Sequence, residues 1–168
     1  MNYFSHLALV SGAAALSTSI HAQTIPAGLE VDFEAGMACD FRLGIDIEGG
    51  PQVFRQFTDK NGNIRVLSAG QGSQLTFYNL SSGAKLTTRP NGSVSHITIN
   101  RDGSQTIVGT GHNVIALFPT DTPPGPDTTM YVGRIEFKFT PDCPTCATGL
   151  TDILRFNGRS TDLCAALS

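Results

Sequence analysis

The stretch SVSHITINRDGSQTIV, residues 93–108, carries the pattern that decides the fold. In its first half Ile97 and Ile99 alternate with His96 and Thr98, which is the pattern of a strand with one buried face. Asp102-Gly103 follows, a pair typical of tight hairpin turns, and residues 104–108 alternate back. The stretch therefore predicts an antiparallel β-hairpin.

The same pattern recurs from Phe41 to Phe156, where short alternating segments are separated by turns. Asn61-Gly62 and Asn91-Gly92 give two further hairpin signals, and we also expect turns at Gly109-Thr110-Gly111 and Asn157-Gly158. The 18 glycines and nine prolines fit many turns rather than long helices. We predict an all-β antiparallel meander of about ten strands, in which neighbours in sequence are neighbours in the sheet.

The way in which this meander closes is a separate question. Ten strands in one open sheet would leave two long edges, which invite aggregation. Closure into a β-barrel removes the edges, and folding into a β-sandwich shortens them. We predict the barrel and keep the sandwich as the alternative. A disulfide between Cys39 and Cys164 would join the two ends of the meander, and closing so long a loop stabilises by about 5 kcal/mol on chain-entropy grounds.

The other two cysteines form the motif Cys143-Pro-Thr-Cys146, in a loop between Pro141 and Gly149. A redox motif of this kind normally opens a helix, and a zinc site would need a second pair of ligands that the sequence does not place at zinc-like spacing. We therefore predict a local structural disulfide, with a redox dithiol and half of a metal site as alternatives. The sequence predicts no metal site and no cofactor.

The N-terminus resembles a secretory signal peptide. Residues 7–15 are apolar or small, and Ile20-His21-Ala22 fits a cleavage site, although the first six residues hold no Lys or Arg. We predict a signal peptide over 1–22 and a single β domain over 23–168, with a buried N-terminal helix as the alternative. Paired cysteines agree with a secreted, extracellular protein. No apolar stretch is long enough to form a transmembrane segment.

Charge excludes one class of partner. The formal net charge is −3 and only 15% of residues are charged, whereas nucleic acid needs a dense basic face. Two sequons, Asn79-Leu-Ser81 and Asn91-Gly-Ser93, lie at predicted strand ends or turns, where glycosylation could occur in a eukaryote.

Several short motifs resemble a group of uncharacterised secreted β-rich proteins from filamentous fungi and actinomycetes. They are Cys-x-Phe at 39–41, Gly-Asn-Ile-Arg at 62–65, Asn-x-Asp-Gly at 100–103 and Thr-Asp-Leu-Cys-Ala-Ala-Leu at 161–167. The resemblance covers roughly residues 39–167 and implies a secreted β fold. It implies no activity, and the Cys143–Cys146 loop departs from the pattern.

Chemistry-bearing residues are sparse. The weak catalytic candidates are His96, His112 and Asp46, because an imidazole or carboxyl can move a proton. A lone strand histidine is more often structural, and no Gly-x-Ser-x-Gly elbow is present.

A closed meander could instead enclose a small apolar ligand, with the Pro-rich loop 119–127 over its mouth. The residues that we expect to line such a cavity, or else to fill the core, are Phe54, Tyr78, Ile115, Leu117 and Tyr131.

Three functions remain open. The first is a secreted, disulfide-stabilised β-barrel that binds a small apolar ligand or an external surface. The second is a cofactor-free secreted cyclase or isomerase of secondary-metabolite biosynthesis, which a sizeable cavity holding His96 or His112 would favour. The third is a secreted virulence or cell-surface factor with a protein partner, which a filled core and an exposed apolar patch would favour. The sequence does not predict the oligomeric state.

Overall fold

The computed structural model describes residues 29–141, 143 and 149–168. The predicted signal peptide and Cys146 lie outside the described residues, so the leader and the Cys143–Cys146 pairing stay predictions. In the described part of the chain no helix has the length and apolar character needed to cross a membrane.

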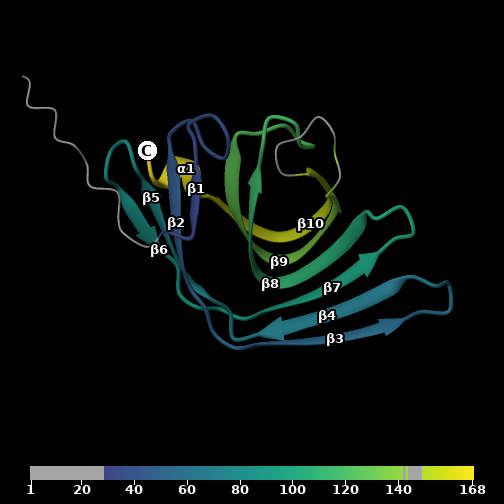
Figure 1. The fold of residues 1–168 in the computed structure, drawn as a ribbon. Helices are drawn as coiled ribbons and strands as arrows, with labels where there is room; N and C mark the ends of the chain where they lie inside the picture. The colour runs from purple at the N-terminus through teal and green to yellow at the C-terminus, as the bar shows by residue number, and fades with distance from the viewer. Residues whose placement is uncertain (1–28, 142, 144–148) are drawn as a thin grey trace, which may run out of the picture.

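Ten strands form two antiparallel sheets, which confirms the all-β prediction (Figure 1). The small sheet has the order β1 (Val31–Phe33), β2 (Leu43–Glu48), β5 (Gln74–Asn79) and β6 (Lys85–Thr87). The large sheet has the order β10 (Leu150–Asp162), β9 (Asp127–Thr140), β8 (Gln105–Leu117), β7 (Ser93–Ile99), β4 (Ile64–Gly70) and β3 (Gln52–Thr58). One short helix, α1 (Leu163–Ala166), follows β10.

The strands do not follow one another as a simple meander. The chain leaves the small sheet after β2, forms the β3–β4 hairpin in the large sheet, returns for β5 and β6, and then completes the large sheet. As a result β2 pairs with β5, and β4 pairs with β7. We find no closed barrel among the described residues, because β3 and β10 remain the two edges of the large sheet, and a sandwich fits the two-sheet arrangement as well.

Three long strands of the large sheet bend together along a line of glycines. Gly111 of β8 pairs with Gly133 of β9, which pairs with Gly158 of β10, and all three have positive φ (89°, 138° and 151°). A Cβ at any of them would lie under 3.0 Å from a backbone oxygen of an adjacent segment, so only glycine fits. We call these residues the glycine seam. The turns predicted at 109–111 and 157–158 are therefore wrong, because β8 and β10 continue through these positions as bent strands.

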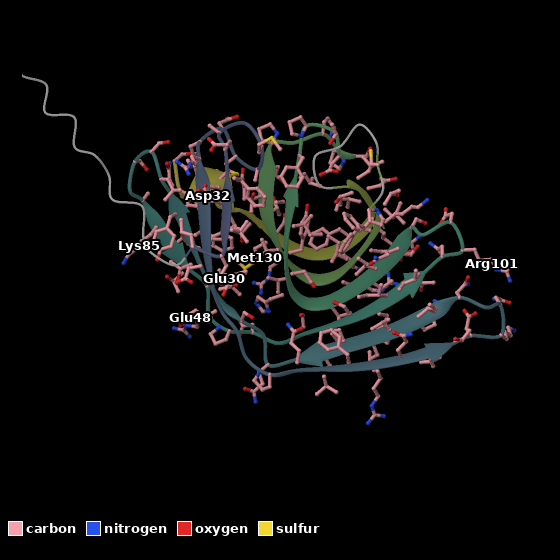
Figure 2. The ribbon with its side chains drawn as sticks, in the orientation of Figure 1. Glu30, Asp32, Glu48, Lys85, Arg101 and Met130 are labelled. Atoms are coloured by element: carbon pink, nitrogen blue, oxygen red, sulfur yellow. A yellow bond between two sulfur atoms is a disulfide. The ribbon has the colours of Figure 1, made fainter. Side chains whose placement is uncertain are left out.

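Beyond the seam, β8 and β9 pack against the small sheet. Buried residues of this first core include Leu43, Phe77, Leu163 and Leu167, with Met130 of β9 packed against them (Figure 2). Helix α1 supplies Leu163, and the residue that follows the helix supplies Leu167. The Asp162 carboxylate caps the helix by accepting the N–H of Ala165 at 2.9 Å. The C-terminal residues therefore complete the core of the small sheet.

The disulfide between Cys39 and Cys164 is confirmed, with a Cα–Cα distance of 5.6 Å. It connects the segment after β1 to α1 and spans 125 residues of sequence. Because Cys39 is buried in the first core, the bond ties the N-terminal part of the small sheet to the end of the large one.

A second core lies on the opposite side of the bent strands. Ile115, Leu117 and Ile135 are its buried residues, and the Tyr131 and Phe156 rings meet edge to face at 4.9 Å. The Pro-rich loop is fixed beside this core, since the buried Asp121 carboxylate accepts the N–H of Thr151 at 2.6 Å.

The outer part of the large sheet, formed by β3, β4 and β7, extends away from both cores (Figure 1). We call it the wing. Among the described residues no second layer packs over β3 and β4, whose neighbours are the adjacent strands of the sheet. At the tip Arg101 joins two turns by donating to the Asn61 carbonyl at 2.8 Å (Figure 2).

Candidate functional site

The strand register divides the wing side chains between two faces, because directly paired residues share a face. One face carries the paired rows Phe57–Arg65–Thr98, Arg55–Leu67–His96 and Val53–Ala69–Val94, and we call it the arginine face. The other carries the paired rows Thr58–Ile64–Ile99 and Gln56–Val66–Ile97, and we call it the isoleucine face. Apolar side chains occupy both faces, so residue polarity alone does not tell which face is exposed to water.

The most exposed apolar side chains of the described chain belong to β3. Phe54 and Val53 are each 62% exposed and Phe57 is 60% exposed. Val53 and Phe57 lie on the arginine face, where Val94 is also exposed, whereas Phe54 lies on the isoleucine face. Contiguous exposed apolar surface is a mark of interaction sites.

An open hollow of about 400 Å³ lies at the outer end of the arginine face. We call it the wing hollow. Its side chains come from three strands and from the β3–β4 turn, and they include Phe57, Asp59, Lys60, Arg65, Leu67 and His96. The volume falls within the range of about 300–1,000 Å³ that is usual for small-molecule sites.

The turn holds Arg65 in a defined position. Its Nε donates to Asp59 Oδ2 at 2.9 Å, and an Nη donates to the Thr98 hydroxyl. Asp59 Oδ1 in turn accepts the backbone N–H groups of Asn61 and Asn63 at 2.9 and 3.0 Å. The Asn63 hydrogen bond, with help from Arg65, lowers the pKa of the Asp59 carboxyl. A guanidinium has five N–H donors, so Arg65 retains donors for an anionic group.

The three weak catalytic candidates lie in separate places. His96 is exposed and lines the wing hollow. His112 lines a different hollow of about 190 Å³ near the glycine seam, where its Nε2 lies 3.3 Å from Asn91 Nδ2. Asp46 belongs to β2 in the small sheet. The structure therefore brings no two of them into one hollow among those described.

The proposed cavity residues are also divided. Ile115, Leu117 and Tyr131 meet in the second core, where burial and the charge of Asp127 raise the pKa of Tyr131. Phe54 lies on the exposed strand β3. The fifth, Tyr78, belongs to β5 in the small sheet. They do not form one cavity wall in the described structure.

The two sequons differ in accessibility. Asn79 is only 5% exposed, its Nδ2 donates to the Leu167 carbonyl at 3.1 Å, and its Oδ1 accepts the N–H groups of Ser81 and Ser82. A glycan on Nδ2 would have to enter this buried position. Asn91 is exposed in the segment before β7, where a glycan has room.

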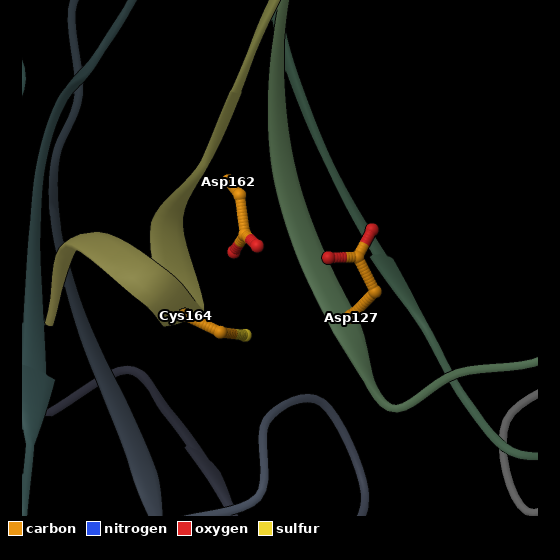
Figure 3. A group of neighbouring side chains, drawn as sticks. All are labelled: Asp127, Asp162 and Cys164. Carbon is orange, nitrogen blue, oxygen red and sulfur yellow. The ribbon is translucent and has the colours of Figure 1, made fainter. Parts of the chain in front are cut away.

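Asp127, Asp162 and Cys164 lie close together, with ligand atoms within 4.8 Å of one another (Figure 3). Each already has a structural role. The Cys164 sulfur is in the disulfide, Asp162 caps α1, and Asp127 accepts the Thr129 hydroxyl at 2.8 Å. The group therefore gives no reason to assign a metal centre.

The chain matches no protein-family model, no curated protein and no solved structure. The resemblance to secreted fungal and actinomycete proteins stays a prediction, and functional inference rests on the geometry of the wing.

Sequence reasoning did not identify the wing as a site. The signal was present in QVFRQFT (52–58), where Val53 and Phe57 lie on one face and Phe54 on the other. A strand that is apolar on both faces indicates burial on both sides or an uncovered edge, and only the fold distinguishes the two.

Proposed function

We propose that this protein is a secreted, non-catalytic binding protein whose contact region is the arginine face of the wing. The observation that carries the proposal is the exposure of three apolar side chains on this face, Val53, Phe57 and Val94, of which Phe57 lines the wing hollow. The Cys39–Cys164 disulfide supports an oxidising compartment, where such bonds persist.

The lining of the wing hollow indicates the chemistry of the ligand. Phe57 and Leu67 supply apolar surface, while Arg65, Lys60 and His96 supply cationic or hydrogen-bonding groups against the single carboxylate of Asp59. The ligand that fits is an amphipathic anion, with an apolar or aromatic body and one acidic group. Such a group could belong to a free molecule or to an external surface.

Phe57 is the expected anchor of binding. A phenylalanine of which 60% is exposed leaves on the order of 120 Å² in water, given that aromatic side chains bury about 150–250 Å² when covered. At about 25 cal/mol per Å², covering this area contributes roughly 3 kcal/mol. Losing the ring should therefore weaken binding by one to two orders of magnitude, about 1.4 kcal/mol being a tenfold change.

The test is a fluorescence titration with 8-anilinonaphthalene-1-sulfonate, an aromatic dye that carries one sulfonate. We expect saturable binding that Phe57→Ala weakens at least tenfold. Leu154→Ala is the matched control, because Leu154 is an apolar side chain 50% exposed on the opposite edge of the same sheet. Equal effects of the two substitutions, or no saturable binding, would reject the arginine face as the contact region.

One observation favours the cyclase or isomerase as a second candidate: His96 lines the wing hollow. In that case His96→Gln would abolish turnover of a metabolite. A binding protein would instead show no product from any bound ligand, measured by mass spectrometry of the ligand after incubation.

A further inference from the structure

Three of the four sheet edges in the described chain carry features that oppose pairing with further strands. β1 and β6 are only three residues long, and β6 carries the exposed Lys85 (Figure 2). β10 has a register shift between Ile153 and Arg155, and Thr122 already bridges to its Asp152. Short strands, bulges, charges and covering segments are the features by which proteins prevent edge pairing.

β3 carries a single charge, Arg55, and none of the other features. It pairs with β4 in an unbroken register over seven residues, all of them exposed, without proline or lysine. The N–H of Asp59 donates to the Asn63 carbonyl at 2.9 Å, so odd-numbered residues of β3 bond to β4. The N–H and C=O groups of the even-numbered residues Gln52, Phe54, Gln56 and Thr58 then point away from β4, in the plane of the sheet and toward its open edge.

The positions of the phenylalanines indicate what kind of partner fits. Phe57 and Phe54 lie on opposite faces of β3, so a surface docked on one face would cover only one of them. A strand added in the plane of the sheet touches side chains on both faces. Within the described residues, the strand with a long, open and weakly charged edge is β3 itself.

We propose that β3 pairs antiparallel with β3 of a second copy of this chain, which joins two six-stranded sheets into one continuous sheet. Such an interface uses the same patch on both copies, as two-fold symmetry requires. The pairing goes beyond the proposed function. The two share Phe57, whereas Arg65, Leu67 and His96 of the wing hollow lie on β4 and β7, inside the edge strand.

The side chains of β3 select the register. A pairing centred on Arg55 would place two arginines directly opposite each other, with Cα atoms about 4.5 Å apart, and like charges there destabilise. A pairing centred on Gln56 instead places Arg55 opposite Phe57 of the second copy, where a guanidinium stacks favourably on the ring. A pairing centred on Phe54 gives Arg55 only Val53 as a partner. The pairing is therefore centred on Gln56.

The oligomeric state tests the interface. We expect the wild-type protein to sediment as a dimer and Gln56→Pro to sediment as a monomer, with at least a hundredfold weaker association. Proline is tolerated where the N–H faces away from the sheet, so the β3–β4 pairing survives the change. Gln56→Val is the control, since it retains the N–H and should remain dimeric.

Gln56→Lys provides a second variant in case proline prevents folding, because it places two ammonium groups opposite each other without changing the backbone. A wild-type monomer at every concentration, or a Gln56→Lys variant as dimeric as wild type, would overturn the proposal. Dye binding by wild type and Phe57→Ala is measured in a separate titration. If no dimer forms, that titration still tests the arginine face as a binding surface.

Disulfide trapping tests the register. Opposed residues in a hydrogen-bonded pair have Cα atoms about 5.5 Å apart, within the range that a disulfide spans. Gln56→Cys should form a covalent dimer under mild oxidation, whereas Phe54→Cys should not. Efficient trapping by Phe54→Cys and none by Gln56→Cys would overturn the register, and trapping by neither would overturn the pairing.

Discussion

The glycine seam allows a quantitative prediction. Each of its residues has a positive φ and also lies in close contact with backbone atoms of a neighbouring segment. In Gly133→Ala the new Cβ would meet the Asn157 carbonyl oxygen and the Cα of Gly158, both under 3.0 Å. These are backbone atoms of a paired strand, so they cannot move aside as a flexible side chain would. The φ of 138° is itself one that L side chains rarely adopt.

The magnitude follows from three contributions. A backbone conformation suited only to glycine costs about 1–3 kcal/mol when another residue occupies it. Overpacking costs about 1–3 kcal/mol more, and the reduced entropy of the unfolded chain returns about 0.4–1 kcal/mol. We therefore expect Gly133→Ala to lower the free energy of unfolding by roughly 3 kcal/mol, with Tm falling by about 2–4 °C per kcal/mol.

Gly103→Ala is the matched control. Gly103 also has positive φ, at 83°, but a Cβ there would meet nothing within 4 Å. Only the left-handed conformation is penalised, at about 1–2 kcal/mol before the same entropic offset. Urea unfolding of both variants with a common m-value measures the difference. Equal losses in the two variants would refute the claim that the seam depends on close backbone approach.

Three further predictions concern stability and modification. Cys164→Ser should lower the free energy of unfolding by up to about 5 kcal/mol, because the disulfide closes a loop of 125 residues. Cys146→Ala should lower it by much less, and the denaturant midpoints of the two variants measure the difference. Because folding lowers the pKa of Asp59, the unfolded chain binds more protons than the folded one in acid. The stability that the Asp59 carboxylate contributes is therefore lost as pH falls below about 4. Asp59→Asn should flatten this part of the stability curve, measured between pH 6 and 2. Expression in a glycosylating host should modify Asn91 and not the buried Asn79, as peptide mass mapping would show; a glycan on Asn79 in folded protein would contradict its burial.

Local chemistry predicted much of the architecture. The hairpins around Asp102-Gly103 and Asn61-Gly62 are both present, because such pairs favour a tight turn between strands that pair. The hairpin predicted at Asn91-Gly92 is wrong, because this pair links β6 and β7, which lie in different sheets. The Cys39–Cys164 bond was also predictable from its position at the two ends of the repetitive region.

Closure and site were not predictable for physical reasons. Gly109-Thr110-Gly111 suits a turn and a bent strand equally, and only the neighbouring glycine of β9 decides between them. Alternation assigns a residue to a face of a strand but does not say what covers that face. For the same reason the sequence could not show that Ile115 fills a core while Phe57 stays exposed.

The position of the disulfide has a consequence for how the chain matures. A growing chain presents Cys39 long before Cys164 is made, and Leu163 and Leu167 of the first core emerge at the same late stage. Contacts so distant in sequence form slowly, since a long loop must close before they stabilise anything. Before Cys164 is made, Cys143 and Cys146 are the cysteines already present in the chain with which the Cys39 thiol can pair. If such an early bond forms, thiol–disulfide exchange is the reaction that replaces it with the Cys39–Cys164 bond once the last residues have been made.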